Sequence, residues 1–134
     1  MKVEFTIDGD PIGKARPRMN TRTGKAYTPT KTRIYEDYIK LLYRTQVKYY
    51  FEGYVRLTIK AFYGVAKSDS KKKKEDKLSN LLRPSKKPDL DNIVKLIADG
   101  LNEIAYKDDT QIVEIVAMKF YSDKPRVEVK IEDI

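Results

Sequence analysis

The stretch that decides the fold of this chain is residues 86–105, KKPDLDNIVKLIADGLNEIA. Pro88 ends the preceding segment, and Asp89 occupies the N-cap position of the helix that the next residues predict. Apolar side chains then recur at helical spacing and form one face: Leu90, Ile93, Val94, Ile97, Leu101 and Ile104. The pattern predicts an amphipathic helix from Asp89 to about Ala105 that packs on the core.

Alternating and helical patterns along the rest of the chain predict four strands and a second long helix. The strands are expected where apolar and polar side chains alternate, at residues 3–7, 55–63, 112–121 and 125–131. The second helix spans residues 30–50, with an apolar face of Ile34, Tyr38, Leu41, Leu42 and Tyr49. Residues 68–82 are polar and lysine-rich, and fit either a short exposed helix or a mobile loop. These elements predict a single α+β domain over residues 1–134, with helices packed on a mixed or mostly antiparallel sheet.

The composition removes several kinds of chemistry. The chain has 134 residues and contains neither histidine nor cysteine. It therefore has no disulfide, no thiolate nucleophile, no cysteine-based metal site and no catalytic triad that uses histidine. An enzyme of this composition depends on carboxylates, lysines, tyrosines, hydroxyls or a bound metal ion, and oxygen ligands suit Mg²⁺ or Mn²⁺.

Charge is unevenly distributed along the chain, whose net charge is +8. Residues 11–35 hold seven basic and no acidic residues, with glycines and prolines interleaved. Residues 66–88 hold nine basic and three acidic residues. Residues 89–134 are acidic, with eleven Asp or Glu against six Lys or Arg. Charge runs are often only solvated surface, but two basic segments of this kind indicate an acidic partner, most simply nucleic acid.

No stretch of the sequence approaches the ~20 consecutive apolar residues of a membrane span. Residues 1–10 alternate polar and apolar side chains where a signal peptide would carry a hydrophobic block. The sequence therefore predicts an intracellular, cytoplasmic protein without a membrane partner.

Two acidic pairs are candidates for catalysis: Asp89 with Asp91 at the helix start, and Asp108 with Asp109 in the turn that follows. Each pair has an ordinary explanation, because acids cap helix N-termini and occupy polar turns. If the chain brings the pairs together, like-charge repulsion favours a divalent cation between them. Asp89, Asp91 and Asp109 would then be oxygen ligands. Lys95, one turn after Asp91, would orient the attacking water or stabilise the charge that develops on the phosphate.

The motif Lys-Lys-Pro-Asp-Leu-Asp-Asn at residues 86–92, with Lys95 after it and Asp-Asp-Thr-Gln-Ile at residues 108–112, resembles the RusA family of Holliday junction resolvases. The resemblance covers nearly the whole chain, and its specific part is residues 86–113. The residues Gly-Lys-Ala-Arg-Pro-Arg at 13–18 also resemble the start of many members. The resemblance implies a RusA-like α+β fold.

The same resemblance implies roles for individual residues and partners. The family's catalytic aspartates, which would also be its metal ligands, fall on Asp89, Asp91 and Asp109, and its lysine falls on Lys95. Asp108 is the additional candidate acid. The family further implies Mg²⁺, with Mn²⁺ as a substitute, a homodimer, and paired nicks across a four-way DNA junction. The setting would be DNA recombination and repair near the nucleoid of a bacterium, with the chain encoded by the bacterium, a phage or a prophage.

Basic side chains of the two positive segments are the expected DNA contacts. An arginine presents a planar fork to phosphate, and a loop rich in glycine and proline lets the backbone approach it. The expected contacts are Lys14, Arg16, Arg18, Lys71, Lys72, Lys73, Lys74, Lys86 and Lys87.

Two other functions fit the same residues. A non-catalytic nucleic-acid-binding protein would use the aspartates as helix caps and turn residues, and it predicts that Asp91→Asn leaves every activity intact. A metal nuclease for other branched DNA such as flaps, or for linear duplex, would keep the aspartates and the ion but cut different DNA. Cleavage of four-way, three-way and linear substrates with Mg²⁺ or with EDTA distinguishes the three functions.

Overall fold

Alternating apolar and polar side chains build the central sheet of the protein. The computed structural model describes residues 1–15 and 17–134. The main sheet has the strand order β1-β6-β4-β5. Its strands are β1 Lys2–Asp8, β4 Val55–Gly64, β5 Ile112–Ser122 and β6 Arg126–Asp133. β4 pairs with β5 in parallel and with β6 antiparallel, so the sheet is mixed and the predicted α+β class is confirmed.

The strands β5 and β6 follow each other in the chain but are not neighbours in the sheet, because β4 lies between them. Their connection, residues 123–125, therefore crosses the end of β4. Gly64 is the last residue of β4, and a Cβ atom on it would lie 3.1 Å from the Pro125 ring. The predicted strands are confirmed, and the missing side chain at Gly64 leaves the room that their connection needs.

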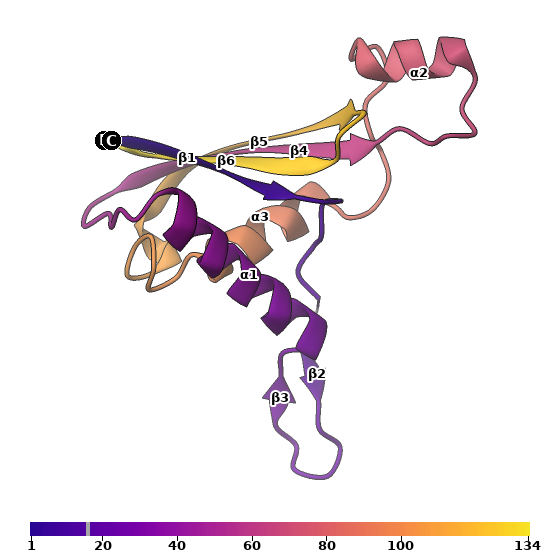
Figure 1. Cartoon of the computed structure of the whole chain (residues 1–134). Helices are drawn as coiled ribbons and strands as arrows, with labels where there is room; N and C mark the ends of the chain where they lie inside the picture. The colour runs from indigo at the N-terminus through magenta and orange to yellow at the C-terminus, as the bar shows by residue number, and fades with distance from the viewer. Residues whose placement is uncertain (16) are drawn as a thin grey trace.

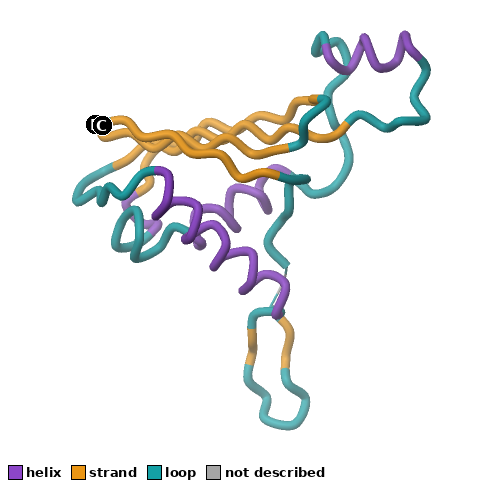
Figure 2. Tube along the Cα trace, viewed as in Figure 1, coloured by secondary structure: helices purple, strands orange, loops and turns teal. Residues whose placement is uncertain are grey.

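Two helices, α1 (Thr30–Gln46) and α3 (Leu90–Gly100), cover one face of the sheet (Figures 1 and 2). α1 buries Ile39 and Tyr43, and the predicted apolar face of this helix is wrong in three of its five members, while Leu42 and Tyr49 pack against the core. Three members of the predicted face are exposed: Ile34, Tyr38 and Leu41. Apolar residues follow two stripes of α1 at helical spacing, and the spacing alone does not say which stripe the sheet covers.

The helix α3 ends at Gly100, not near Ala105 as the apolar spacing predicts. Glu103 has a φ angle of +68°, in the left-handed region, so the chain leaves the helical path there. Tyr106 is fully buried, and its hydroxyl donates a hydrogen bond of 2.7 Å to the carbonyl oxygen of Ala98. The chain therefore turns back along α3 after the helix ends, and this return brings the second acidic pair toward the helix.

Two segments project from this body (Figure 1). The hairpin, residues 17–28, pairs β2 (Arg18–Met19) with β3 (Ala26–Tyr27), and no alternation in the sequence predicts it. The α2 lobe, residues 65–82, contains α2 (Lys71–Leu78), which is one of the two predicted alternatives for this segment. Ser70 explains this helix, because its side chain accepts a hydrogen bond of 3.2 Å from the backbone N–H of Lys73. No helix in the part of the chain that the structure describes is long and apolar enough to cross a membrane.

The contact between α1 and α3 is close enough to test. A Cβ atom on Gly100 would lie 3.0 Å from Ile39 Cδ1, and Ile39 is fully buried. We expect Gly100→Val to lower the free energy of unfolding by about 1–3 kcal/mol, because overpacking displaces the two helices. Urea titration followed by circular dichroism measures this. Gly53→Val is the control, since a Cβ on Gly53 meets nothing within 4 Å; equal losses from the two variants would contradict this account of the helix contact.

Candidate active site

The segment that leads into α3 is fixed on the sheet by side chains of β4 and β5. The Tyr63 hydroxyl donates to the carbonyl oxygen of Pro88 at 2.5 Å, and the Lys119 ammonium donates to that of Lys86 at 2.9 Å. The Arg83 guanidinium in turn donates to the carbonyl oxygen of Lys119 at 2.6 Å. These bonds fix the entry of the chain into α3, although the side chains of Lys86 and Lys87 remain exposed.

Asp89 is the N-cap residue of α3 by position but not by hydrogen bonding. Its backbone is extended, with φ −68° and ψ 148°, and in the described part of the chain its carboxylate accepts no capping hydrogen bond. Burial raises the pKa of the nearby Tyr63 to about 12, and the negative charge of Asp89 adds to this rise. The Asp89 carboxylate is exposed, so capping does not account for its presence.

One stripe of α3 carries the charged groups, while the opposite face packs on the core. Asp91, Lys95 and Asp99 follow each other at intervals of four residues, so their side chains lie along one line on the helix. Ile93 and Leu96 are fully buried on the core side. The helix therefore presents acid, base and acid in succession at the edge of the buried layer.

The second acidic pair follows in a short 3-10 helix, Asp109–Gln111, and its two members have different surroundings. Asp108 caps this helix: its carboxylate accepts from the backbone N–H of Thr110 at 3.3 Å, and Gln111 completes a capping box. These hydrogen bonds lower the pKa of Asp108. Asp108 thus has the ordinary structural role that the sequence allows for it, which leaves Asp109 as the acid without a capping role.

Asp109 meets α3 at Asp99. Burial raises the pKa of Asp109, a hydrogen bond to Asp99 and the charges of Asp108 and Asp99 raise it further, and only Lys95 opposes them. Asp91 lies two helical turns from Asp99, which is about 12 Å along the helix axis. The structure therefore brings Asp109 to the Asp99 end of the charged stripe rather than to the end that carries Asp89 and Asp91.

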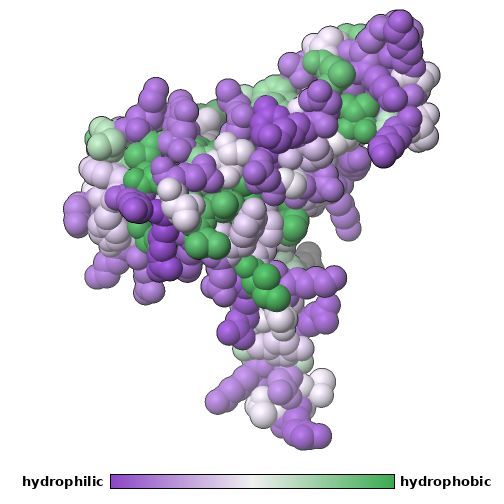
Figure 3. Space-filling view, in the orientation of Figure 1, coloured by the Kyte–Doolittle hydropathy of each residue, from purple (hydrophilic) through white to green (hydrophobic). Residues whose placement is uncertain are grey.

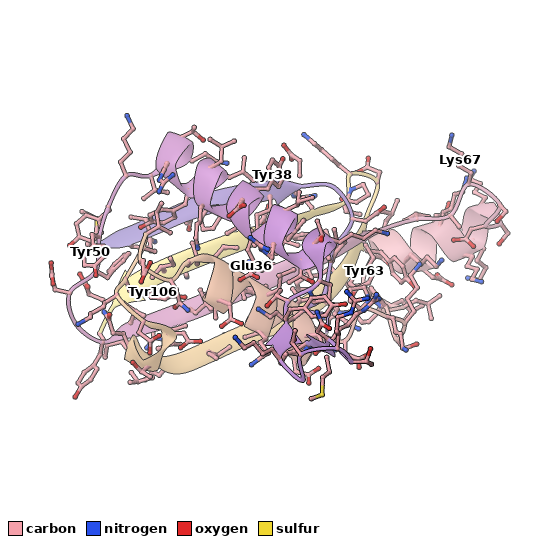
Figure 4. The ribbon with its side chains drawn as sticks, turned by 90° about the horizontal axis from the view of Figure 1, so that it is seen from below. Glu36, Tyr38, Tyr50, Tyr63, Lys67 and Tyr106 are labelled. Carbon is pink, nitrogen blue, oxygen red and sulfur yellow. The ribbon has the colours of Figure 1, made fainter. Side chains whose placement is uncertain are left out.

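Lys14 lies between α1 and α3 and pairs with an acid on each. Its ammonium is 3.0 Å from Asp99 and 3.3 Å from Glu36, which extends from α1 toward α3 (Figure 4). The Lys14 side chain is only 14% exposed. Burial by itself lowers the pKa of Lys14, but the hydrogen bonds and charges of Asp99 and Glu36 outweigh this effect and raise it. Lys14 is thus an internal ion-pair partner in this structure, while its contact with DNA stays a prediction.

A hollow of about 620 Å³ adjoins the N-terminus of α3. The chain around Gly13 lines it on one side, and residues 87–92 line it on the other. The backbone N–H of Lys14 donates to the carbonyl oxygen of Asn92 at 3.0 Å. A Cβ atom on Gly13 would lie 3.0 Å from side-chain carbons of Pro88 and Asn92, so only glycine allows this approach. The hollow places open space beside the exposed carboxylate of Asp89.

The oxygen donors of this region determine whether it can bind a divalent cation. Within residues 1–15 and 17–134, no group of three acid side chains lies close enough together to bind one ion. Mg²⁺ commonly takes one or two carboxylates and completes its octahedron with water and substrate phosphate oxygens. Asp99 and Asp109 form one such pair, and their mutual repulsion is the situation that a cation relieves. The residues therefore fit Mg²⁺ or Mn²⁺.

Most of the predicted DNA contacts are at the surface. Lys71, Lys72 and Lys73 are exposed on α2, and Lys74 is half-buried. Lys72 lies 4.0 Å from Asp76, and Lys73 lies 3.8 Å from Asp69, so these two ammonium groups have acidic neighbours. Arg18 is exposed on β2. Arg16 lies outside the described residues.

Sequence reasoning missed Asp99 and Glu36. Asp99 lies four residues after Lys95, just as Lys95 lies four residues after Asp91. Continuing this spacing along the helix would therefore have identified Asp99. Glu36 has no such signal, because its importance depends on how α1 crosses α3. Tyr63 and Lys119 also lack one, since they contact the site through backbone carbonyl groups.

The opposite pKa shifts of Asp108 and Asp109 predict opposite effects on stability. The pKa of Asp109 is higher in the folded protein than in the unfolded chain, so folding favours the protonated side chain. At neutral pH the side chain is a carboxylate, and its charge then lowers the stability of the fold. We expect Asp109→Asn to raise the free energy of unfolding by less than about 1 kcal/mol, because solvent screens the repulsion. Asp108→Asn should lower stability, because the lowered pKa marks a stabilising carboxylate. Thermal unfolding in metal-free buffer at pH 7 measures both, and shifts of the same sign would contradict the assignment.

Lys14 should contribute stability that depends on pH. We expect Lys14→Gln to lower the free energy of unfolding at pH 7 by about 1–2 kcal/mol, because two partly buried carboxylates lose their partner. The raised pKa means that this contribution is complete below pH 10.5 and is lost as pH rises through the higher folded value. Urea titrations from pH 7 upward test this, with the exposed Lys31→Gln as control. A difference between wild type and variant that stays constant through this range would contradict the ion-pair role.

Comparison with known proteins agrees with these features. The family model described as endodeoxyribonuclease RusA matches residues 8–132. A protein of Bacillus subtilis (strain 168) named uncharacterized protein YqaN is 40% identical over 137 residues, which cover 98% of this chain and 96% of that protein. The crossover junction endodeoxyribonuclease rusA of Lactococcus phage r1t is 28% identical over 134 residues, with 98% and 96% covered. The family model covers nearly all of the chain, so this protein belongs to the RusA endodeoxyribonuclease family.

Proposed function

We propose that this protein is a metal-dependent endodeoxyribonuclease that resolves four-way DNA junctions by paired, symmetric nicks. Membership of the RusA family supports the nuclease class, and the name of the phage relative supports a crossover junction as substrate. The observation that supports the proposal is the return of the chain after α3, because Asp109 then lies near Asp99 and Lys95 of the charged stripe.

The charged stripe supplies the groups that phosphodiester hydrolysis needs without histidine. A bound Mg²⁺ or Mn²⁺ supplies an activated water and neutralises charge on the phosphate. The carboxylates of Asp89, Asp91 and Asp109 are the proposed ligands. Because Asp109 lies at the Asp99 end of the stripe, Asp89 with Asp91 and Asp99 with Asp109 would act as two separate carboxylate pairs, not as one cluster. Lys95 lies one turn from both Asp91 and Asp99, where its ammonium would stabilise negative charge on the scissile phosphate.

The proposed substrate explains the proposed assembly. A four-way junction has approximate two-fold symmetry, so a homodimer with one acidic site in each chain would place one site at each of two equivalent strands. The basic hairpin and the α2 lobe would contact phosphates around the crossover, so that shape rather than base sequence is recognised. We place this activity in recombination and repair of DNA in bacteria, including phage and prophage DNA.

Substitution of Asp91 tests the nuclease proposal. We expect Asp91→Asn to reduce cleavage of a synthetic four-way junction in Mg²⁺ by roughly 10²-fold or more, because a catalytic carboxylate is removed. Junction binding in EDTA should stay the same or tighten, since one negative charge near the DNA is gone. Denaturing gels measure the nicks, and fluorescence anisotropy measures the binding. Asp37→Asn makes the same change at an exposed site on α1 and should leave both unchanged.

The substrate panel separates the competing functions. Wild type is incubated with four-way, three-way, flap and linear DNA in Mg²⁺, in Mn²⁺ and in EDTA. Cutting that is confined to four-way DNA and needs a metal ion supports the resolvase. Equal cutting of flaps or linear duplex would instead indicate a broader metal nuclease. No cutting of any branched DNA with either metal would indicate a non-catalytic binding protein and overturn the proposal.

A further inference from the structure

The hairpin has a well-defined turn. The Asn20 carboxamide oxygen accepts from the backbone N–H groups of Arg22 and Thr23 at 2.9 and 3.3 Å. The backbone N–H of Gly24 donates to the carbonyl oxygen of Asn20 at 2.7 Å, and Gly24 has a φ angle of +71° that favours glycine. The segment is therefore a short two-stranded ribbon with a fixed end, and it projects well beyond the helices (Figure 1).

Both faces of this ribbon are uncovered. Arg18 is paired with Tyr27, and Met19 with Ala26, so each pair occupies one face. All four residues are exposed, with Met19 at 65% and Tyr27 at 49%. A two-stranded ribbon alone in water is marginally stable, and large apolar side chains gain from being covered. Two exposed faces of this kind indicate a segment that enters a groove of a partner, where both faces are covered together.

The charge of the hairpin indicates the chemistry of that partner. Its charged residues are Arg18, Arg22 and Lys25, and no acidic residue lies within residues 11–35. None of the ion pairs found in residues 1–15 and 17–134 includes any of these three side chains. The α2 lobe differs, since two of its lysines have acidic neighbours. Hydrophilic side chains cover most of the hairpin surface in Figure 3, and its charged side chains are all cationic, which favours a polyanionic partner.

The base of the hairpin is attached beside the acidic site. Gly13 and Lys14 precede the hairpin in the chain, and both contact α3, through Asn92 and Asp99. The segment that leads into the hairpin therefore lies beside the start of α3, which carries Asp89 and Asp91.

We propose that the hairpin enters the major groove of a DNA arm next to the strand that is cut. This rests on the proposed function, because it assumes that DNA occupies the acidic site. The major groove, about 12 Å wide, admits a two-stranded ribbon as it stands, whereas the minor groove, about 6 Å wide, takes one only when the DNA is deformed. Arg18, Arg22 and Lys25 then contact the phosphates that line the groove, and the ribbon faces lie toward its walls. The position of the hairpin in the groove then determines which DNA arm of the junction lies over the acidic site.

The test replaces the three basic side chains together. Arg18→Gln, Arg22→Gln and Lys25→Gln in one chain should weaken junction binding in EDTA by roughly 10- to 100-fold at 0.1 M salt. The slope of log affinity against log salt should become less steep by about 2–3, because up to three phosphate contacts are lost. The matched control is Lys2→Gln, Arg44→Gln and Lys48→Gln, which removes equal charge from exposed positions outside both basic segments. The control should change neither the affinity nor the slope.

Methylation of bound DNA identifies the groove. Dimethyl sulfate modifies guanine N7 in the major groove and adenine N3 in the minor groove. Wild type should protect guanine N7 in the arm next to the cut, and the triple hairpin variant should not. Protection of adenine N3 alone, or a triple variant with the wild-type slope, would overturn the proposal. A triple variant that loses dimerisation in sedimentation would also overturn it, since the hairpin would then contact a second copy of the chain.

These outcomes are distinct from failure of the proposed function. If wild type cuts four-way junctions while the triple variant binds and protects DNA as wild type does, the resolvase assignment stands and the groove contact is wrong. If wild type neither cuts nor binds branched DNA, the proposed function fails and the groove contact fails with it.

Discussion

The ion pairs of Lys14 are the contact on which the arrangement of the site depends. One ammonium joins the segment before the hairpin to Glu36 on α1 and to Asp99 on α3. Asp99 also helps to raise the pKa of Asp109, so the same small region joins the N-terminal segment, both long helices and the turn before β5. Its acids, Glu36, Asp99 and Asp109, outnumber the two lysines beside them, Lys14 and Lys95. The fold thus carries electrostatic repulsion where the proposed chemistry needs a cation.

Much of the fold follows from local patterns in the sequence, and the exceptions have identifiable causes. The strands and α3 are predicted because alternation and helical spacing reflect which face is buried. The burial of Ile39 and Tyr43, and the exposure of Ile34 and Leu41, depend instead on where the sheet lies. The hairpin is unpredicted because the residues of its short strands are exposed, so no buried apolar face marks them in the sequence.

The residues of the candidate site likewise fall into those that local sequence patterns predict and those that depend on the tertiary fold. Asp89, Asp91 and Lys95 are found from spacing on one helix, which is a local property. The distinct roles of Asp108 and Asp109 follow from a capping box and a contact with Asp99, and the contact is visible only once the chain path after Gly100 is known. The ion pairs of Lys14 join residues from three separate segments, so no local pattern in the sequence indicates them.

The distribution of charge has a simple consequence for how DNA would approach. The acidic groups lie at the start and along one stripe of α3, close to the body of the protein, whereas much of the positive charge lies on two segments that project from it (Figure 1). Phosphates approaching from solvent therefore meet cations first and carboxylates last. At an ionic strength of 0.15 M, charges are screened beyond about 8 Å, so the acids would not repel a duplex that is contacted only by the projecting segments. Net positive charge can then draw DNA to the protein although the site itself is acidic, and repulsion remains only at the phosphate that comes nearest to the carboxylates. In the proposed reaction, a divalent cation would be needed only at that one phosphate, which is where hydrolysis would use it.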